Sequence, residues 1–142
     1  MKQIIFNLVY FCAAFFFFSC SKEKDANGDI TVENLSDTYE LKALTWMSGS
    51  TNVNVYELLD DCEKDNLIRL NVDKTANYID AGIVCSPPED ENGTWYLSGD
   101  SLYLSNGADG GKIKSFDGTT LVLTGSPASD PGVTATTTLQ KK

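Results

Sequence analysis

The sequence contains no histidine among its 142 residues. A chain without imidazole has no Ser–His or Cys–His nucleophile, no imidazole base and no imidazole metal ligand. Paired carboxylates hydrolyse glycosides when two acids lie a few ångströms apart in a cleft, but the sequence singles out no such pair among its 20 acidic residues. We therefore predict that the protein is not an enzyme and has neither a metal site nor a cofactor.

Basic residues are also scarce, at 11 against 20 acidic ones, which gives a formal net charge of −9. Every acidic residue lies after position 20. Nucleic-acid binding requires a basic stripe that displaces counterions from the phosphates. The composition therefore argues against a nucleic-acid partner, and the length fits one modest domain.

The longest apolar run, Ile4–Phe18, is too short to cross a bilayer as a helix. It follows Lys2, and this arrangement is typical of a secretory signal peptide. The next residues, Phe17-Phe18-Ser19-Cys20, resemble the lipobox of bacterial lipoproteins, although Phe17 stands where Leu is usual. That resemblance implies that residues 1–19 are removed and that Cys20 is anchored in a membrane by acyl chains such as palmitate. The alternative is an ordinary signal peptide with an incidental cysteine.

Residues 20–37 are expected to form the acylated cysteine and a flexible tether, because they are polar and lack sustained periodicity. Ser21–Asp25 is similar to the Lys-plus-acidic signal that sends some bacterial lipoproteins to the cell surface. A solvated tether explains the same residues equally well. We expect an exported bacterial lipoprotein of the outer membrane, on its periplasmic face or on the cell surface.

Two cysteines remain after Cys20 is assigned to lipid and Cys12 to the removed segment. An exported domain folds in an oxidising compartment, so Cys62 and Cys85 are predicted to form a disulfide. The chain-entropy model gives such a link about 3 kcal/mol of stabilisation. Two free buried thiols are the alternative, and a zinc site is disfavoured because four ligands are needed and histidine is absent.

Short alternating runs dominate the chain from Tyr39 onward. Leu67–Val72 places Ile68, Leu70 and Val72 on one face, as a strand with one buried side does. Similar runs, separated by Gly and Asp turn residues, lie at 77–79, 95–97, 102–104, 112–114, 121–123 and 133–139. Val55–Leu59 fits either a helical turn or a strand.

The strands predict an all-β fold over residues 38–142. Eight or nine short antiparallel strands imply an up-and-down meander, and closing it into a small β-barrel of about eight strands removes its exposed edges. A β-sandwich is the competing architecture.

One stretch, Asn92–Leu104, resembles the G-x-W-x-L-x-G-D-x-L-x-L pattern of bacterial lipocalin-like domain lipoproteins. Asp61–Asn66, with the later Cys85, is similar to a second signature of these proteins. Departures include Leu44 where Gly is usual and Asp73-Lys74 in place of an Asp-Gly turn. The resemblance implies a calycin-type, lipocalin-like barrel, which does not by itself specify a ligand.

An acidic cluster precedes the Leu67 strand and comprises Asp60, Asp61, Glu63 and Asp65. It imitates the start of a calcium loop but lacks the glycine and the bidentate glutamate that such a loop needs. We interpret it as a solvated hairpin tip steadied by the disulfide. Glu89–Glu91, beside two prolines, is interpreted as a stiff exposed loop.

Aromatic and leucine side chains are expected to line a pocket or to fill the barrel core. They are Trp46, Tyr78, Trp95, Leu97, Leu102 and Leu104. An eight-stranded barrel is just wide enough for packed side chains or one small ligand. The first hypothesis is therefore a membrane-anchored module that binds a small apolar or amphipathic molecule. The second is a surface lipoprotein with a filled core that engages a protein or glycan through its loops. A cavity larger than one water distinguishes them, and the sequence gives no oligomeric state.

Overall fold

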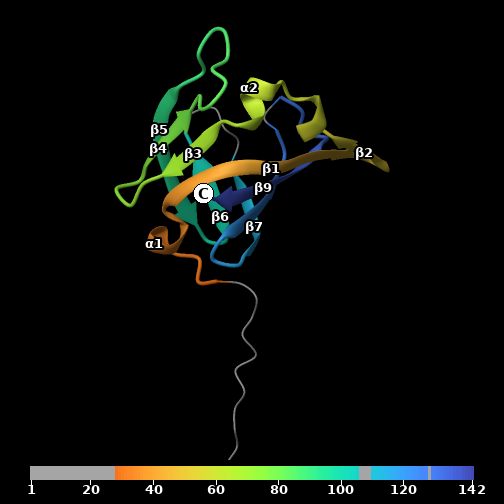
Figure 1. Cartoon of the computed structure of the whole chain (residues 1–142). Coiled ribbons are helices and arrows are strands. Elements are labelled where there is room, and N and C mark those ends of the chain that lie inside the picture. The colour runs from red at the N-terminus through yellow and green to blue at the C-terminus, as the bar shows by residue number, and fades with distance from the viewer. Residues whose placement is uncertain (1–27, 106–109, 128) are drawn as a thin grey trace, which may run out of the picture.

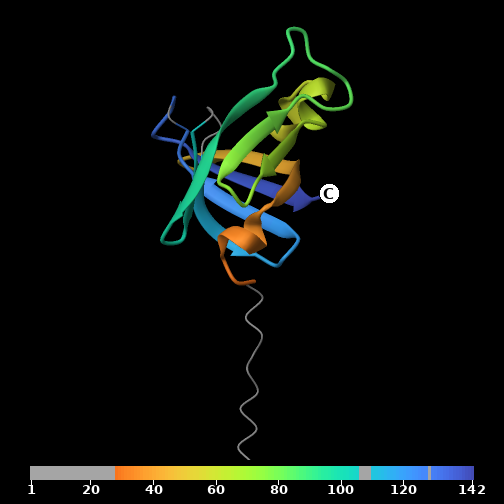
Figure 2. The same cartoon turned by 90° about the vertical axis from the view of Figure 1, so that its left-hand side faces the viewer.

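The computed structural model describes residues 28–105, 110–127 and 129–142. The predicted signal peptide and Cys20 lie outside these residues. The elements are α1 (Val32–Leu35), β1 (Asp37–Ser48), β2 (Thr51–Asn54), η1 (Tyr56–Leu58), α2 (Asp61–Lys64), β3 (Leu67–Leu70), β4 (Thr75–Ile79), β5 (Glu91–Ser98), β6 (Ser101–Leu104), β7 (Gly111–Phe116), β8 (Thr120–Gly125) and β9 (Thr134–Lys141). In both views of the molecule α1 lies at the lower end of the barrel and α2 at its upper end (Figures 1 and 2).

The strands form one antiparallel sheet in the order β2-β1-β3-β4-β5-β6-β7-β8-β9, and β1 also pairs with β9. That last pairing closes eight strands into a barrel and leaves β2 as an extension. β1 is long enough to pair with β3 through Asp37–Glu40 and with β2 through Thr45–Ser48. The meander and the barrel are confirmed, and the sandwich is excluded because one closed sheet contains all the described strands.

The core fills the α1 end of the barrel and consists mainly of inward-facing residues from the strands. Its buried members are Leu35, Tyr39, Leu70, Ala76, Trp95, Leu102, Ile113, Phe116, Leu121, Leu123 and Leu139. The indole N–H of Trp95 donates to the carbonyl of Asn71 at 2.8 Å, so the only polar atom of this buried side chain is satisfied.

The tether ends earlier than predicted, because residues 28–37 belong to the folded domain. Thr31 caps α1 by accepting a hydrogen bond from the Asn34 N–H at 3.1 Å. Leu35 at the other end of this short helix is fully buried in the barrel core. The segment therefore closes one end of the barrel, and its polar residues are those that remain in water.

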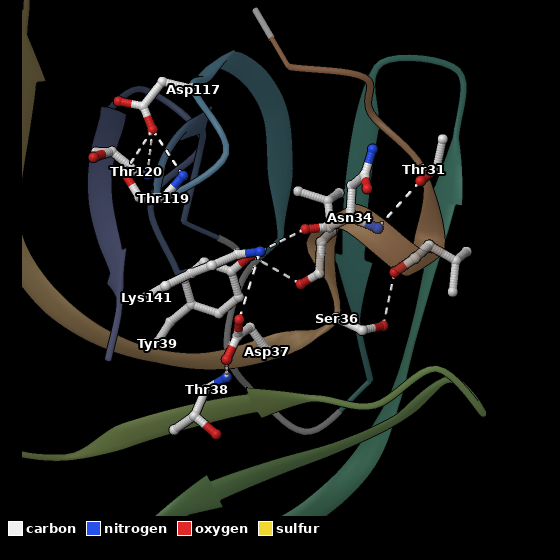
Figure 3. Close-up of polar contacts among 12 residues, drawn as sticks. Thr31, Asn34, Ser36, Asp37, Thr38, Tyr39, Asp117, Thr119, Thr120 and Lys141 are labelled. Carbon is white, nitrogen blue, oxygen red and sulfur yellow. Dashed lines mark hydrogen bonds and ion pairs between the residues drawn. The ribbon is translucent and has the colours of Figure 1, made fainter.

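Side chains from the first and last strands bind the carbonyls at the end of α1 (Figure 3). The Tyr39 hydroxyl donates to the Leu35 carbonyl at 2.9 Å, and Lys141 Nζ donates to the Asn34 carbonyl at 2.7 Å. Lys141 also lies 3.6 Å from the Asp37 carboxylate and 5.3 Å from the Phe116 ring centroid. Burial, with a smaller contribution from Asp37, raises the pKa of Tyr39 well above its usual range.

The turn between β7 and β8 depends on one carboxylate. Asp117 Oδ1 accepts hydrogen bonds from the backbone N–H groups of Thr120 at 2.6 Å and Thr119 at 2.8 Å (Figure 3). These bonds favour the charged form and lower the pKa of Asp117 to about 2.

One strand boundary differs from the sequence prediction, and one segment that the sequence left open is now assigned. Strand β3 ends at Leu70, so Val72 lies in the following turn with 61% of its surface exposed, and its predicted place on the inner face is wrong. The ambiguous segment around Tyr56 forms the 3₁₀ turn η1 rather than a strand. Lys74 stands where the lipocalin-like pattern has the glycine of an Asp-Gly turn. Its φ is +68°, in the left-handed conformation that favours glycine.

Candidate ligand-binding cavity

A cavity of about 240 Å³ lies inside the barrel at the end away from α1. Its described lining comprises Leu41, Leu44, Trp46, Ile68, Leu104, Gly110, Leu123, Gly125, Ser126, Pro127, Ala135, Thr137 and Leu139. None of these residues carries a charge, and the polar side-chain groups are the hydroxyls of Ser126 and Thr137 and the indole N–H of Trp46. The volume far exceeds that of one water, about 30 Å³, and falls just below the range of about 300–1,000 Å³ typical of small-molecule pockets.

The cavity exists because the inward-facing residues of β8 and β9 become smaller toward the mouth of the barrel. Near α1, Leu121 pairs with Leu139 and both side chains are buried in the core. Toward the mouth, Thr137 faces inward, and the next inward pair is Gly125 with Ala135. Side chains of this size cannot fill an eight-stranded barrel. The barrel is therefore solid at one end and hollow at the other.

A β-bulge in β1 completes the wall. The register with β9 shifts between Leu41 and Ala43, so Lys42 is the extra residue. Before the bulge Tyr39 and Leu41 face inward, whereas after it Leu44 and Trp46 line the cavity. One strand thus contributes to both the solid core and the cavity wall with large apolar side chains.

The rim of the cavity includes the hairpin of β1 and β2. Trp46, which is 37% exposed, pairs across the hairpin with Val53. Because directly paired residues share a face, Val53 extends the apolar wall beyond the closed part of the barrel. Pro127 lies on the connection that follows β8 and lines the cavity with a buried side chain.

Glycines bring three neighbouring strands close together beside the mouth. A Cβ at Gly110 would lie 2.2 Å from the Leu102 carbonyl oxygen, and one at Gly111 would lie 2.6 Å from that of Thr124. Backbone atoms cannot move aside as flexible side chains do, so both positions require glycine. This packing holds the short pairing of β6 with β7, which is registered through Ser101 and Leu102.

The structure separates the six residues that were predicted to line a pocket or core. Trp46 and Leu104 line the cavity, whereas Trp95 and Leu102 are buried in the core and Leu97 packs against it. Tyr78 lies outside both groups, and its hydroxyl accepts a hydrogen bond from the Asn66 side chain at 2.9 Å. Burial raises the pKa of this phenol.

Sequence reasoning missed most of the cavity lining. Leu41 and Leu44 were missed because the bulge between them breaks the alternation of the strand. Gly110 and Gly125 were missed because glycines between strands indicate turns. A usable signal was present in 133–139, where alternate residues grow from Ala135 to Leu139 toward the C-terminus. A graded series of this kind indicates a tapering interior.

The predicted disulfide is present, with Cys62 and Cys85 joined and their Cα atoms 5.2 Å apart. The acidic cluster beside it is a helical turn rather than a hairpin tip, because Asp61–Lys64 forms α2. The backbone N–H of Asp60, the residue that precedes α2, donates to the Glu63 carboxylate at 2.7 Å. Over the described ranges, no three Cys, Asp or Glu side chains gather as metal ligands would.

The described part of the chain contains no helix with the length and apolarity needed to cross a membrane. A family model for a lipocalin-like domain matches residues 21–123. No curated protein matches the sequence. No solved structure matches it either.

Proposed function

Because this chain belongs to the lipocalin-like domain family, we propose that it binds a small, uncharged apolar or amphipathic molecule in the mouth of its barrel. The observation that carries this proposal is the apolar cavity of about 240 Å³, which extends from the buried Leu139 to the rim at Trp46. A family assignment and a fold do not define a function. The proposal therefore depends on the cavity itself.

The chemistry of the lining supports an uncharged occupant. Transfer of an ionised group into such a site without a partner is strongly unfavourable, and the described lining residues offer no countercharge. The hydroxyl of Thr137 can accept or donate one hydrogen bond inside the cavity. The space corresponds to about eight waters at ~30 Å³ each, so the buried part of the ligand is small, and a polar head would remain at the rim.

We also propose that the protein acts as a lipoprotein of the bacterial outer membrane, anchored through Cys20. The lipobox-like sequence Phe17–Cys20 supports this part of the proposal. Cys20→Ala should abolish the incorporation of labelled palmitate and leave the protein with its signal peptide uncleaved. Palmitate incorporation equal to that of the wild type would refute anchoring through Cys20 and leave the cavity proposal intact.

The cavity is tested by filling it from one strand of known register. Thr137 lines the cavity, whereas its neighbour Thr136 is absent from the lining and, by alternation, faces the outside of the barrel. Thr137→Leu and Thr136→Leu therefore add the same atoms on opposite faces of β9. The probe is N-phenyl-1-naphthylamine, an uncharged apolar fluorophore, titrated into the protein lacking its anchor.

The wild type and Thr136→Leu should bind the probe saturably at one site, and Thr137→Leu should bind at least tenfold more weakly. Equal affinity of both variants would show that the probe binds elsewhere, and an absence of saturable binding by the wild type would refute the proposal. Native against denaturing mass spectrometry of protein purified from its own host would then give the mass of any retained ligand.

A further inference from the structure

The loop between β4 and β5, residues 80–90, presents two adjacent apolar side chains to water. Ile83 is 60% exposed and Val84 is 59% exposed, although each is β-branched and of a type normally buried. Single exposed apolar residues are common on protein surfaces. Two in succession on an ordered loop call for a physical explanation.

The base of the loop is held by a buried carboxylate. Asp80 is 8% exposed and accepts hydrogen bonds from the backbone N–H of Cys85 at 3.1 Å and of Glu89 at 3.0 Å. The N–H of Asp80 itself donates to the Asp90 carboxylate at 3.1 Å. These contacts connect both arms of the loop, which fixes the backbone between them.

The side of the loop is held from α2 and the residues that follow it. Asp65 Oδ2 accepts from the Ile83 N–H at 2.8 Å, and Cys62 is covalently bonded to Cys85. Gly82 has a φ of +60°, and a Cβ there would lie 2.2 Å from the Asp65 carboxylate. Glycine at this position therefore allows the carboxylate to reach the backbone beside Ile83.

These contacts order the backbone around Ile83 and Val84 without burying their side chains. Ordering a loop costs conformational entropy, which is normally offset by packing its side chains. Here polar contacts and a disulfide hold the backbone, while Ile83 and Val84 keep their apolar surface exposed. A preorganised apolar pair loses little further entropy when it binds, so more of its interaction energy appears as affinity.

The surroundings of Ile83 and Val84 are acidic. The carboxylates of Glu89 and Asp90 lie on the loop, and Glu91 follows at the start of β5. The helix α2, which is bonded to the loop, carries Glu63 and the ion pair of Asp61 with Lys64. Such a surface repels anionic lipid headgroups and a second copy of itself, and it complements a basic surface.

We propose that the 80–90 loop is a docking element, which inserts Ile83 and Val84 into an apolar pocket of a partner protein whose rim carries lysine or arginine. The apolar pair supplies the buried anchor of the interface, and the acidic residues pair with the basic rim. This role is independent of ligand binding, because no residue of the loop lines the cavity.

The experiment is site-specific photocrosslinking of the full-length protein in its own host. A benzophenone amino acid replaces Val84 in one variant and Val72 in the other. Val72 is the matched control, because it is a valine of similar exposure, 61% against 59%, on the turn after β3. Peptide mapping of each adduct identifies the class of molecule and the residues at the point of contact.

The expected result is a discrete protein adduct from position 84 alone, mapped to an apolar segment next to lysine or arginine. Ile83→Asp should leave the melting temperature unchanged, because the side chain is exposed, but reduce the yield of this adduct at least fivefold. A combined Glu89→Lys and Glu91→Lys variant should reduce it similarly.

Other outcomes would overturn the proposal. They are an adduct to lipid, an adduct to a second copy of the chain, equal adducts from positions 72 and 84, and no adduct at position 84. A protein adduct whose contact segment lacks basic residues, or whose yield is unchanged in Ile83→Asp, would also refute it.

Discussion

Replacing Leu35 with alanine tests whether α1 is part of the folded domain. Leu35 is fully buried in the core at the closed end of the barrel. Truncation of a buried leucine costs about 3 kcal/mol, because apolar contacts are lost and a cavity remains. At roughly 4 °C per kcal/mol for a domain of this size, Leu35→Ala should lower the melting temperature by roughly 12 °C.

The assay is urea and thermal unfolding followed by circular dichroism on the protein lacking its anchor. Glu33→Ala is the matched control, because Glu33 lies in the same helix with its side chain exposed. That variant should change stability by less than about 0.5 kcal/mol. If Leu35→Ala were as stable as Glu33→Ala, residues 28–36 would not close the barrel, and the segment would be the tether that the sequence alone suggested.

Replacing Cys62 and Cys85 together with serine should destabilise the domain by about 3 kcal/mol, and a urea midpoint equal to that of the wild type would contradict this. Asp117 stabilises the folded state when charged, because its pKa falls from 3.8 unfolded to about 2 folded. This contribution is complete above pH 3.8 and is lost as pH falls toward 2, so Asp117→Asn should reduce stability at pH 6 and flatten the acid limb of the stability profile; an unchanged acid limb would argue against the turn contacts. Lys74→Gly should raise stability by about 0.5–1 kcal/mol, because φ is +68° there, and a lower melting temperature would refute this assignment of strain.

The sequence predicted strands well where alternation and turn residues agree. Leu102 and Leu104 are two residues apart and face inward together, as expected. The disulfide followed from compartment and cysteine number rather than from any geometric signal. These features are local or compositional, so one sequence is enough to predict them.

The remaining features depend on contacts between distant residues. The four-residue helix α1 shows no periodicity, and Leu35 is buried only because the strands provide an open end to cover. The bulge at Lys42 is defined by register with β9, about a hundred positions away in the chain. The cavity likewise results from small residues such as Gly125 and Ala135 meeting across strands.

The closed end formed by α1 also governs the direction from which the cavity is reached. The described chain enters the barrel at Gly28, whose N–H bonds to Phe116 beside α1, whereas the cavity opens at the far ends of β1 and β9. The eight residues of β9 span about 27 Å at ~3.4 Å per residue. The described chain therefore begins at the sealed base of the barrel, and the cavity opens at the opposite end. Figure 2 shows this start of the described chain beside the lower end of the barrel. A molecule that enters the cavity therefore passes the rim at Trp46, at the end of the barrel opposite Gly28.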